Sequence, residues 1–334
     1  MRFTKLFAAV LCSLAALAAS GQNLRDEIAA NPRKSGGVYY VYTYDNPVLT
    51  PAPKGYKPFY ISHYGRHGSR WLLHDSEYDE VMAVFRAADA ANAFTERGRE
   101  VYGRVKRVYD DGINRGGDLS PLGAEQHREI AGRMYRNFPE VFRSGAVVDA
   151  QATLVVRCVL SMAAFCERLK ELNPRLEVSR TAGRRTTRYL NFYSKPTNPT
   201  LSREYLDFID KGGWQEEYER IGDRFVRPGR LMSELFADGE FVRTIDAQKL
   251  MKGLFYFAAD MQNVGLGISF YDLFTTDELY GLNVYDNYKY YVIRGPSPLN
   301  RRFPQYYAKA LLEDFLTRAD RAVEGGAVSA DLRF

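Results

Sequence analysis

The sequence predicts an α/β fold, a sheet flanked by helices, and three patterns along the chain indicate it. Lys57–Tyr64 is an apolar, aromatic run typical of a buried strand, and it ends in a turn that contains two glycines. Ala152–Val156 has the pattern of a second strand and precedes an apolar helix. A helix over Phe303–Val323 is followed by a strand that starts at Val328. Strands that alternate with helices favour a sheet covered by helical layers.

Residues 1–20 have the three parts of a secretory signal. Arg2 and Lys5 are basic, Leu6–Leu17 is apolar, and Ala18-Ala19-Ser20 offers small residues for cleavage. The apolar stretch is too short to span a bilayer comfortably. We therefore expect no membrane span and an exported protein, located in the periplasm, at the outer surface or outside the cell.

The net charge and the cysteines indicate neither a nucleic-acid partner nor a disulfide. Removal of residues 1–20 takes away two positive charges, so the formal charge falls from +5 to about +3. This small excess gives no reason to expect a nucleic-acid partner. Cys158 and Cys166 would lie ~12 Å apart along one helix, which is too far for a disulfide. The chain is expected to rely on its hydrophobic core, and it is long enough for one large or two modest domains.

The most informative stretch is Arg66-His67-Gly68-Ser69-Arg70, directly after the first predicted strand. A guanidinium binds phosphate or carboxylate through two parallel hydrogen bonds and remains charged. Neighbouring positive charge favours the neutral form of His67, which keeps a ring nitrogen lone pair available. A neutral histidine that faces an arginine-bound phosphate is a nucleophile facing its electrophile. These residues also allow a plainer interpretation, in which His67 is only hydrogen-bonded at the end of a strand.

Two later segments bear on the same site. Ser120, followed by Pro121, has the pattern of a helix N-cap. His127 falls on the polar side of that helix, and we expect it to be a plain surface histidine. Arg157 comes between a strand and a helix, where it would point towards the cleft at the carboxyl ends of the strands. From this segment alone, a surface position for Arg157 remains open.

Three motifs resemble one known family. Arg66-His67-Gly68-Ser69-Arg70 resembles the Arg-His-Gly-x-Arg signature of the histidine phosphatase superfamily. Leu119–Gly123 is similar to the Leu-Ser/Thr-x-x-Gly segment of these phosphatases, and Arg157–Met162 to their Arg-Cys-x-x-Ser-Ala stretch. The wider context resembles the histidine acid phosphatase branch, which includes phytases and multiple inositol polyphosphate phosphatases.

The resemblance assigns roles to four residues. It implies that His67 is phosphorylated and that Arg66, Arg70 and Arg157 bind the phosphoryl oxygens. It implies neither a metal ion nor another cofactor, and the partner is a small phosphorylated substrate. His63 and His67 are four residues apart, but on a strand and turn rather than a helix, so they are not expected to share a metal ion.

The resemblance also implies the architecture, a histidine-phosphatase-like central mixed sheet flanked by helices with a mostly helical cap. We assign residues 21–166 and 292–334 to the α/β core and residues 167–291 to the cap. The arginines within residues 184–188 form either a solvated face or part of a pocket for further phosphates. Other helices are expected over Glu96–Asp110, Leu250–Val264 and Thr276–Tyr291.

In the histidine acid phosphatases, a strand like Val328–Phe334 leads into a second signature, His-Asp or His-Ala-Glu. Its histidine contacts phosphate, and its acid protonates the leaving alcohol. All four histidines of this chain lie in its first 130 residues, namely His63, His67, His74 and His127. We therefore expect a chain that is cut before the second motif. The general acid is assigned to no residue, since Asp75 and Glu77, near the first signature, are expected to be exposed.

Two functions of different classes follow. The first is an exported phosphomonoesterase that hydrolyses organic phosphates, with inositol polyphosphates as the favoured substrate. The second is a catalytically impaired, truncated phosphatase that only binds phosphorylated ligands through its arginines. A phosphoryl-shuttling mutase fits less well, because such enzymes act on cytosolic metabolites. The sequence determines neither the exact substrate and its positional preference nor the oligomeric state.

Overall fold

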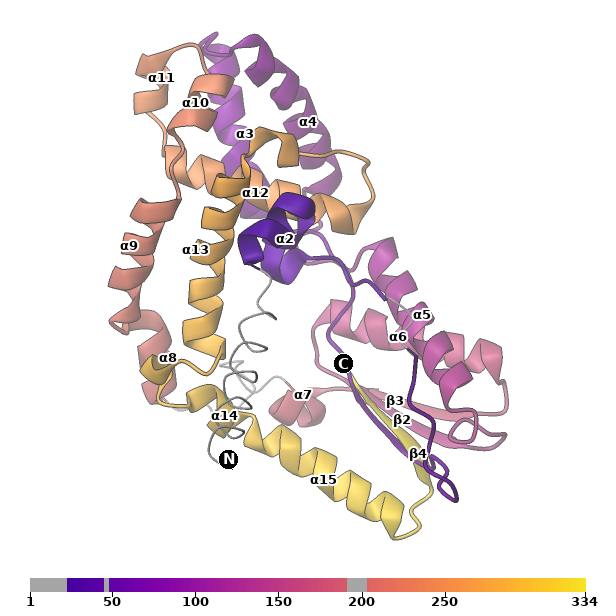
Figure 1. Ribbon diagram of the computed structural model, residues 1–334. Coiled ribbons are helices and arrows are strands. Elements are labelled where there is room, and N and C mark those ends of the chain that lie inside the picture. Colours follow the sequence, from indigo (N-terminus) through magenta and orange to yellow (C-terminus); the bar gives the residue numbers. More distant parts are fainter. Residues whose placement is uncertain (1–22, 45–47, 191–202) are drawn as a thin grey trace, which may run out of the picture.

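The computed structural model describes residues 23–44, 48–190 and 203–334 (Figure 1). The predicted signal, residues 1–20, lies outside the described residues and stays a prediction. A sheet with its flanking helices occupies one end of the molecule, and a larger body of helices occupies the other. Among the described residues no helix is both long and apolar enough to cross a membrane. Cys158 and Cys166 are both free thiols.

The sheet confirms the α/β class. It has four described strands in the order β1-β4-β2-β3. They are β1 Ile61–Tyr64, β2 Val147–Ala152, β3 Glu177–Ala182 and β4 Val328–Arg333. Neighbouring strands all run parallel, whereas a mixed sheet was predicted. Helices connect β1 to β2, β2 to β3 and β3 to β4. Each of these connections returns the chain to the same end of the sheet, which produces parallel pairing.

One face of the sheet carries the apolar core of this layer. Side chains alternate between the two faces of a strand, and the buried Ala150 and Leu332 are paired neighbours on β2 and β4. The helices α5 (Pro121–Asn137) and α6 (Val156–Leu172) pack over these residues (Figure 1). This apolar packing holds α5 and α6 against the sheet from which the signature loop emerges.

The other face of the sheet is polar and joins the helix α15, Lys309–Val323. Asp149 and Asp331 project from adjacent strands, and Arg318 of α15 lies 2.7 Å and 2.5 Å from their carboxylate oxygens. Arg333 is buried and pairs with Asp314 of the same helix at 2.8 Å. Buried charges require partners of this kind. Both faces of the central strand β4 are therefore covered.

The remaining helices form the helical body and its connections. The larger ones are α3 Asp75–Ala90, α4 Glu96–Gly112, α9 Trp214–Phe225, α12 Ala247–Val264 and α13 Thr276–Arg294. The shorter ones are α2 Leu24–Ala30, α7 Arg184–Leu190, α8 Arg203–Lys211, α10 Gly229–Leu235, α11 Gly239–Arg243 and α14 Phe303–Tyr307. Three 3₁₀ segments, Pro32–Tyr39, Tyr271–Leu273 and Pro298–Asn300, connect them.

The packing divides the chain differently from the assigned boundaries. The helices α3 and α4, which we assigned to the α/β core, share one hydrophobic cluster with α10 and α12. Gly253 of α12 lets these helices approach closely, because a Cβ there would come within 2.5 Å of Val81. The strand β3, which we assigned to the cap, pairs with β2 along its whole length. The chain thus leaves the sheet after the signature and returns to it with α5.

Several local predictions match the structure closely. The helices expected from Glu96, Leu250 and Thr276 begin within three residues of those positions. The helix expected over Phe303–Val323 is instead two helices, α14 and α15, with Ala308 between them. The strand expected over Ala152–Val156 is wrong, because β2 ends at Ala152 and α6 begins at Val156.

Candidate active site

The signature loop packs directly on the first turn of α5. A Cβ on Gly68 would come within 2.2 Å of the carbonyl oxygen of Gly123, and one on Gly123 within 2.1 Å of the carbonyl oxygen of Ser69. The two backbones can touch only because both residues are glycine. Ser120 caps the helix as predicted, and its Oγ accepts a hydrogen bond from the N–H of Gly123 at 3.2 Å. Pro121 occupies the first helical position.

A buried polar network holds the loop from three sides. The Ser69 N–H donates to Oε1 of Gln126 at 2.8 Å, and the Ser69 Oγ donates to Oδ1 of Asn263 at 2.7 Å. Nδ2 of Asn263 donates to the carbonyl oxygen of Tyr39 at 2.9 Å, and the Ser120 Oγ donates to the Asn263 carbonyl oxygen at 2.7 Å. Satisfied buried networks of this kind favour one conformation. The network ties the signature loop to α5, to α12 and to the end of the 3₁₀ segment Pro32–Tyr39.

The helix α6 makes a further contact that brings Arg157 to the loop. The N–H of Gly68 donates to Oγ of Ser161, which is fully buried, at 3.1 Å. Arg157 lies one helical turn before Ser161 and so on the same side of α6. Arg157 was predicted at the end of a strand, but it lies in the first turn of α6. Its Nη1 donates to the carbonyl oxygen of Gly117 at 3.3 Å.

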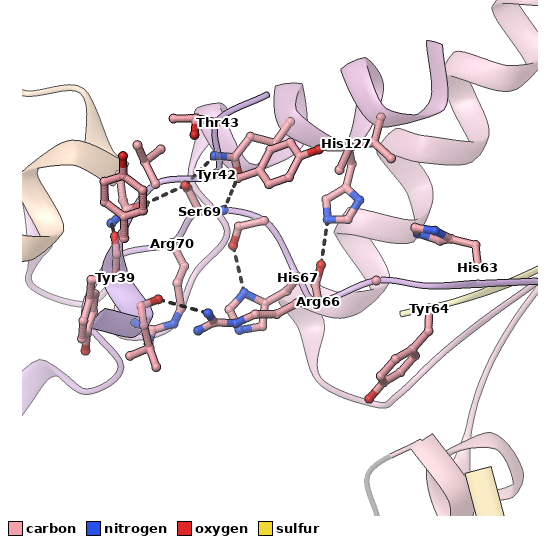
Figure 2. A pocket seen from close by; sticks show the side chains of 18 residues that line it. Tyr39, Tyr42, Thr43, His63, Tyr64, Arg66, His67, Ser69, Arg70 and His127 are labelled. Carbon is pink, nitrogen blue, oxygen red and sulfur yellow. Dashed lines mark hydrogen bonds between the residues drawn. The ribbon is translucent and has the colours of Figure 1, made fainter. Parts of the chain in front are cut away.

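His67 is oriented by its own loop. Nδ1 lies 2.8 Å from the carbonyl oxygen of Gly68 (Figure 2). A carbonyl oxygen only accepts hydrogen bonds, so Nδ1 carries the proton and Nε2 keeps its lone pair. Burial is the largest of the effects that lower the pKa of His67 to about 4. The hydrogen bond to the Gly68 carbonyl raises this pKa, and the positive charges of Arg66, Arg157 and Arg70 lower it, in that order. The imidazole is therefore neutral at neutral and mildly acidic pH.

The two arginines of the signature are anchored through backbone carbonyl groups. Nη1 of Arg66 donates to the carbonyl oxygen of Val38 at 3.0 Å (Figure 2). Nη1 of Arg70 donates to that of Trp71 at 2.6 Å, and its guanidinium lies 5.1 Å from the centroid of the Tyr39 ring. Together with Arg157, these groups concentrate positive charge around one imidazole. Such an arrangement suits a phosphoryl group, whose oxygens carry negative charge.

A cavity of about 610 Å³ opens beside the loop. Its walls include the whole signature, residues 38–43, and the residues Gln126, His127 and Ile130 of α5. Arg157 is not among its lining residues, and neither are Arg184 and Arg185, which lie exposed on α7. The side chain of Arg188 lies outside the described residues. Within the described part of the chain, no group of three or more His, Cys, Asp or Glu side chains could hold a metal ion.

His127 is not a surface residue, and that prediction is wrong. Its side chain is 2% exposed, and its ring packs against Phe334 at a centroid distance of 5.4 Å and against Phe165 at 6.5 Å. Nε2 lies 3.1 Å from the carbonyl oxygen of Arg66. The helical pattern counted histidine as polar and turned it outwards. In the structure this side of α5 faces the signature loop instead of solvent.

Sequence reasoning also missed three polar residues around the loop. Gln126 and Asn263 complete the network on Ser69. Asp260, on the same helix as Asn263, is fully buried, and burial raises the pKa of its carboxyl group to about 8 although the nearby Arg70 lowers it. No local pattern could have identified the two residues of α12, because they lie about 190 residues from the signature. Gln126 lies within a predicted helix, but nothing in the sequence shows which way it points.

Comparison with solved structures identifies the fold. The chain matches the multiple inositol polyphosphate phosphatase of Bifidobacterium longum with a TM-score of 0.73 at 20% identity, covering 89% of this chain and 76% of that one. The fold is that of the histidine acid phosphatases. The same phosphatase in complex with inositol hexasulfate gives a TM-score of 0.73 at 19% identity, covering 88% of this chain and 76% of that one. The phytase from D. castellii gives 0.60 at 14% identity, covering 90% and 65%.

No protein-family model matches the chain, and neither does any curated protein sequence. The structural likeness confirms the histidine-phosphatase-like α/β fold expected from the three motifs. At these identities it concerns the fold alone, so the roles of His67 and of the arginines remain predictions drawn from the motifs and from the geometry of the site.

The close approach of the two backbones gives a first prediction. Gly68→Ala should lower the free energy of unfolding by ~1–3 kcal/mol, because its Cβ must displace the first turn of α5. Gly103→Ala is the matched control, since a Cβ at this position in α4 meets open space. It should stabilise the protein by ~0.5–1 kcal/mol. Urea unfolding measures both, and equal effects of the two variants would contradict the packing described.

The charge around His67 gives a second prediction. In an NMR titration the imidazole of His67 should change protonation near pH 4, far below an exposed histidine. Arg66→Met removes one positive neighbour and should raise the pKa of His67. Burial remains in that variant, so the pKa should stay below 6.5. A pKa of His67 that does not change in Arg66→Met would show that the guanidinium does not act on this ring.

Proposed function

We propose that this protein is an exported phosphomonoesterase that hydrolyses organic phosphate esters through a phosphohistidine at His67. Inositol polyphosphates are the favoured substrates. The observation that carries the proposal is the state of His67, a neutral imidazole with its Nε2 lone pair available beside three guanidinium groups. Export rests on the predicted signal in residues 1–20.

The reaction follows from these groups in two steps. Nε2 of His67 attacks phosphorus in line, a nitrogen–phosphorus bond forms, and the bond to the ester oxygen breaks. Arg66, Arg70 and Arg157 offset the negative charge on the three equatorial oxygens. The leaving alkoxide takes up a proton from solvent water to become the alcohol, since no side chain is assigned as the donor. Water then attacks the phosphohistidine, which releases inorganic phosphate and restores the neutral His67.

The choice of substrate draws on charge and on the comparisons. The Bifidobacterium longum phosphatase forms complexes with inositol hexasulfate and with phosphate, two anionic ligands. In this chain a cavity of about 610 Å³ is lined by the signature, and it offers space for a ring next to the guanidinium groups of Arg66 and Arg70. A polyanionic ring would place one phosphate at His67 and the others around it, where positive charge favours binding.

The alternative is a protein that binds phosphorylated ligands without hydrolysing them. One observation favours it. Within residues 23–44, 48–190 and 203–334, the charges that act most strongly on His67 are those of guanidinium groups, and no carboxylate is among them. A general acid contributes roughly 10²–10⁴-fold to such a reaction. Aryl phosphates need that proton least, because phenolate is a good leaving group. Hydrolysis of nitrophenyl phosphate together with binding, but no turnover, of inositol hexakisphosphate would favour the alternative for the natural substrate.

The nucleophile is tested by substitution. His67→Ala should lower the hydrolysis of nitrophenyl phosphate at least ~10³-fold, because no other group replaces Nε2. His74→Ala is the control, since His74 is exposed beside the signature and lies outside the cavity lining. Its rate should match that of the wild type in a steady-state assay. If the two variants lose activity to the same extent, His67 is not the nucleophile.

The phosphate site is tested through Arg157. Arg157→Ala should lower the affinity for inorganic phosphate at least ~10-fold, because a charged hydrogen-bond partner is lost from a half-buried site. Arg185→Ala removes a guanidinium of equal charge from an exposed position on α7 and should change the affinity little. Calorimetry with inorganic phosphate measures both. A larger loss in Arg185→Ala would move the phosphate site to α7.

A further inference from the structure

His127 makes a contact with the signature loop that the proposed reaction does not use directly. It lies on α5, and its ring points at the carbonyl oxygen of Arg66 (Figure 2). The distance from Nε2 to this oxygen is 3.1 Å. The oxygen belongs to the peptide group that joins Arg66 to His67. Any movement of this peptide group therefore changes the direction of both side chains.

The contact determines the protonation state of the ring. The Arg66 carbonyl oxygen can only accept, so Nε2 of His127 carries the proton. Nδ1 is buried and has no hydrogen-bond partner among the described residues. In a neutral imidazole this leaves one lone pair without a hydrogen bond, which costs far less than a buried charge. A protonated imidazole would place a second N–H and a positive charge where no described acceptor receives them.

The side chains around His127 would not offset the positive charge of a protonated ring. From β1 the ring of His63 faces it, and His63 also keeps a buried Nε2 without a described partner. From α6 and from the residue after β4 come two phenyl rings, Phe165 and Phe334. From the loop comes the backbone of Arg66, whose carbonyl accepts the Nε2 proton; this hydrogen bond raises the pKa of His127 less than burial lowers it. Burial lowers the pKa of His127 to about 4, and burial together with His127 lowers that of His63 to about 4.

We propose that His127 is a positioning residue of the phosphatase site, whose neutral ring holds the Arg66 carbonyl and so aims Arg66 and His67 at the phosphoryl group. This inference rests on the proposed function. It adds a requirement that the nucleophile alone does not impose, because a second histidine must stay neutral for the loop to keep its geometry.

The requirement acts in acid. Protonation of His127 adds charge and an unsatisfied N–H beside the loop, so the ring leaves the Arg66 carbonyl or the loop moves. Either change misdirects the phosphate-binding groups. As the pH falls towards 4, the site then loses its nucleophile through His67 and its geometry through His127. Protonation of either histidine impairs the site. The loss of activity in acid should therefore follow the uptake of at least two protons.

Two variants separate the hydrogen bond from the packing. In His127→Gln the side-chain amide nitrogen occupies the place of Nε2 and donates to the same carbonyl, but it does not titrate in this pH range. In His127→Phe the ring volume stays and the donor is lost. Tyr135→Phe, elsewhere on α5, controls for a mild change in the same helix. Circular dichroism confirms that each variant is folded before it is assayed.

The expected results differ for each variant. His127→Phe should lower kcat/KM for nitrophenyl phosphate ~10-fold. It should lower the affinity for inorganic phosphate, measured by calorimetry, by a similar factor. His127→Gln should stay within ~3-fold of the wild type in both measurements. Its acid limb, plotted as log kcat/KM against pH, should be shallower than that of the wild type by one proton. Tyr135→Phe should keep the wild-type slope.

Three outcomes would overturn the inference. The first is wild-type kcat/KM and phosphate affinity in His127→Phe. The second is a loss in His127→Gln equal to that in His127→Phe, which would assign the residue a packing role only. The third is an unchanged acid slope in His127→Gln. If the wild-type protein hydrolyses no aryl phosphate, the proposed function fails, and the affinities for inorganic phosphate still test the positioning role.

Discussion

The architecture of the site depends on one contact, in which the backbone of the signature loop lies against the first turn of α5. Gly68 and Gly123 permit this contact, since a side chain on either would overlap the other segment. Once the loop lies there, the Ser69 N–H reaches Gln126 and the Gly68 N–H reaches Ser161. The helices that cover the sheet thereby determine where His67 points.

The second constraint is electrostatic. Three guanidinium groups surround an imidazole that is already partly desolvated, and both effects disfavour its protonation. Binding of an anion relieves the repulsion among the cations, so the site is suited to a phosphoryl group before one arrives. Burial raises the pKa of Asp260, which lies near Arg70, and so favours its neutral form. Asp260 therefore offsets the charge of Arg70 less than an exposed carboxylate would.

The sequence predicted what local patterns encode and missed what tertiary packing decides. The signature, the cap of α5 at Ser120 and the start of α4 depend on neighbouring residues, and these were found. The buried face of α5 was misjudged at His127, because a polar residue type does not reveal a polar environment. Asn263 reaches the loop from a distant helix, and its role appears only when the helical body folds against α5. The parallel strand directions likewise depend on crossovers and not on strand composition.

The most direct test is to locate the phosphoryl group during turnover. The protein is mixed with nitrophenyl phosphate, quenched in denaturant at alkaline pH, where phosphohistidine survives, and analysed by phosphorus NMR and by mass spectrometry of its peptides. We expect one phosphate, on Nε2 of His67, because Nδ1 is committed to the Gly68 carbonyl. A phosphate on Nδ1 or on any other residue, or hydrolysis without a trapped phosphoenzyme in the same experiment, would show that Nε2 of His67 is not the nucleophile.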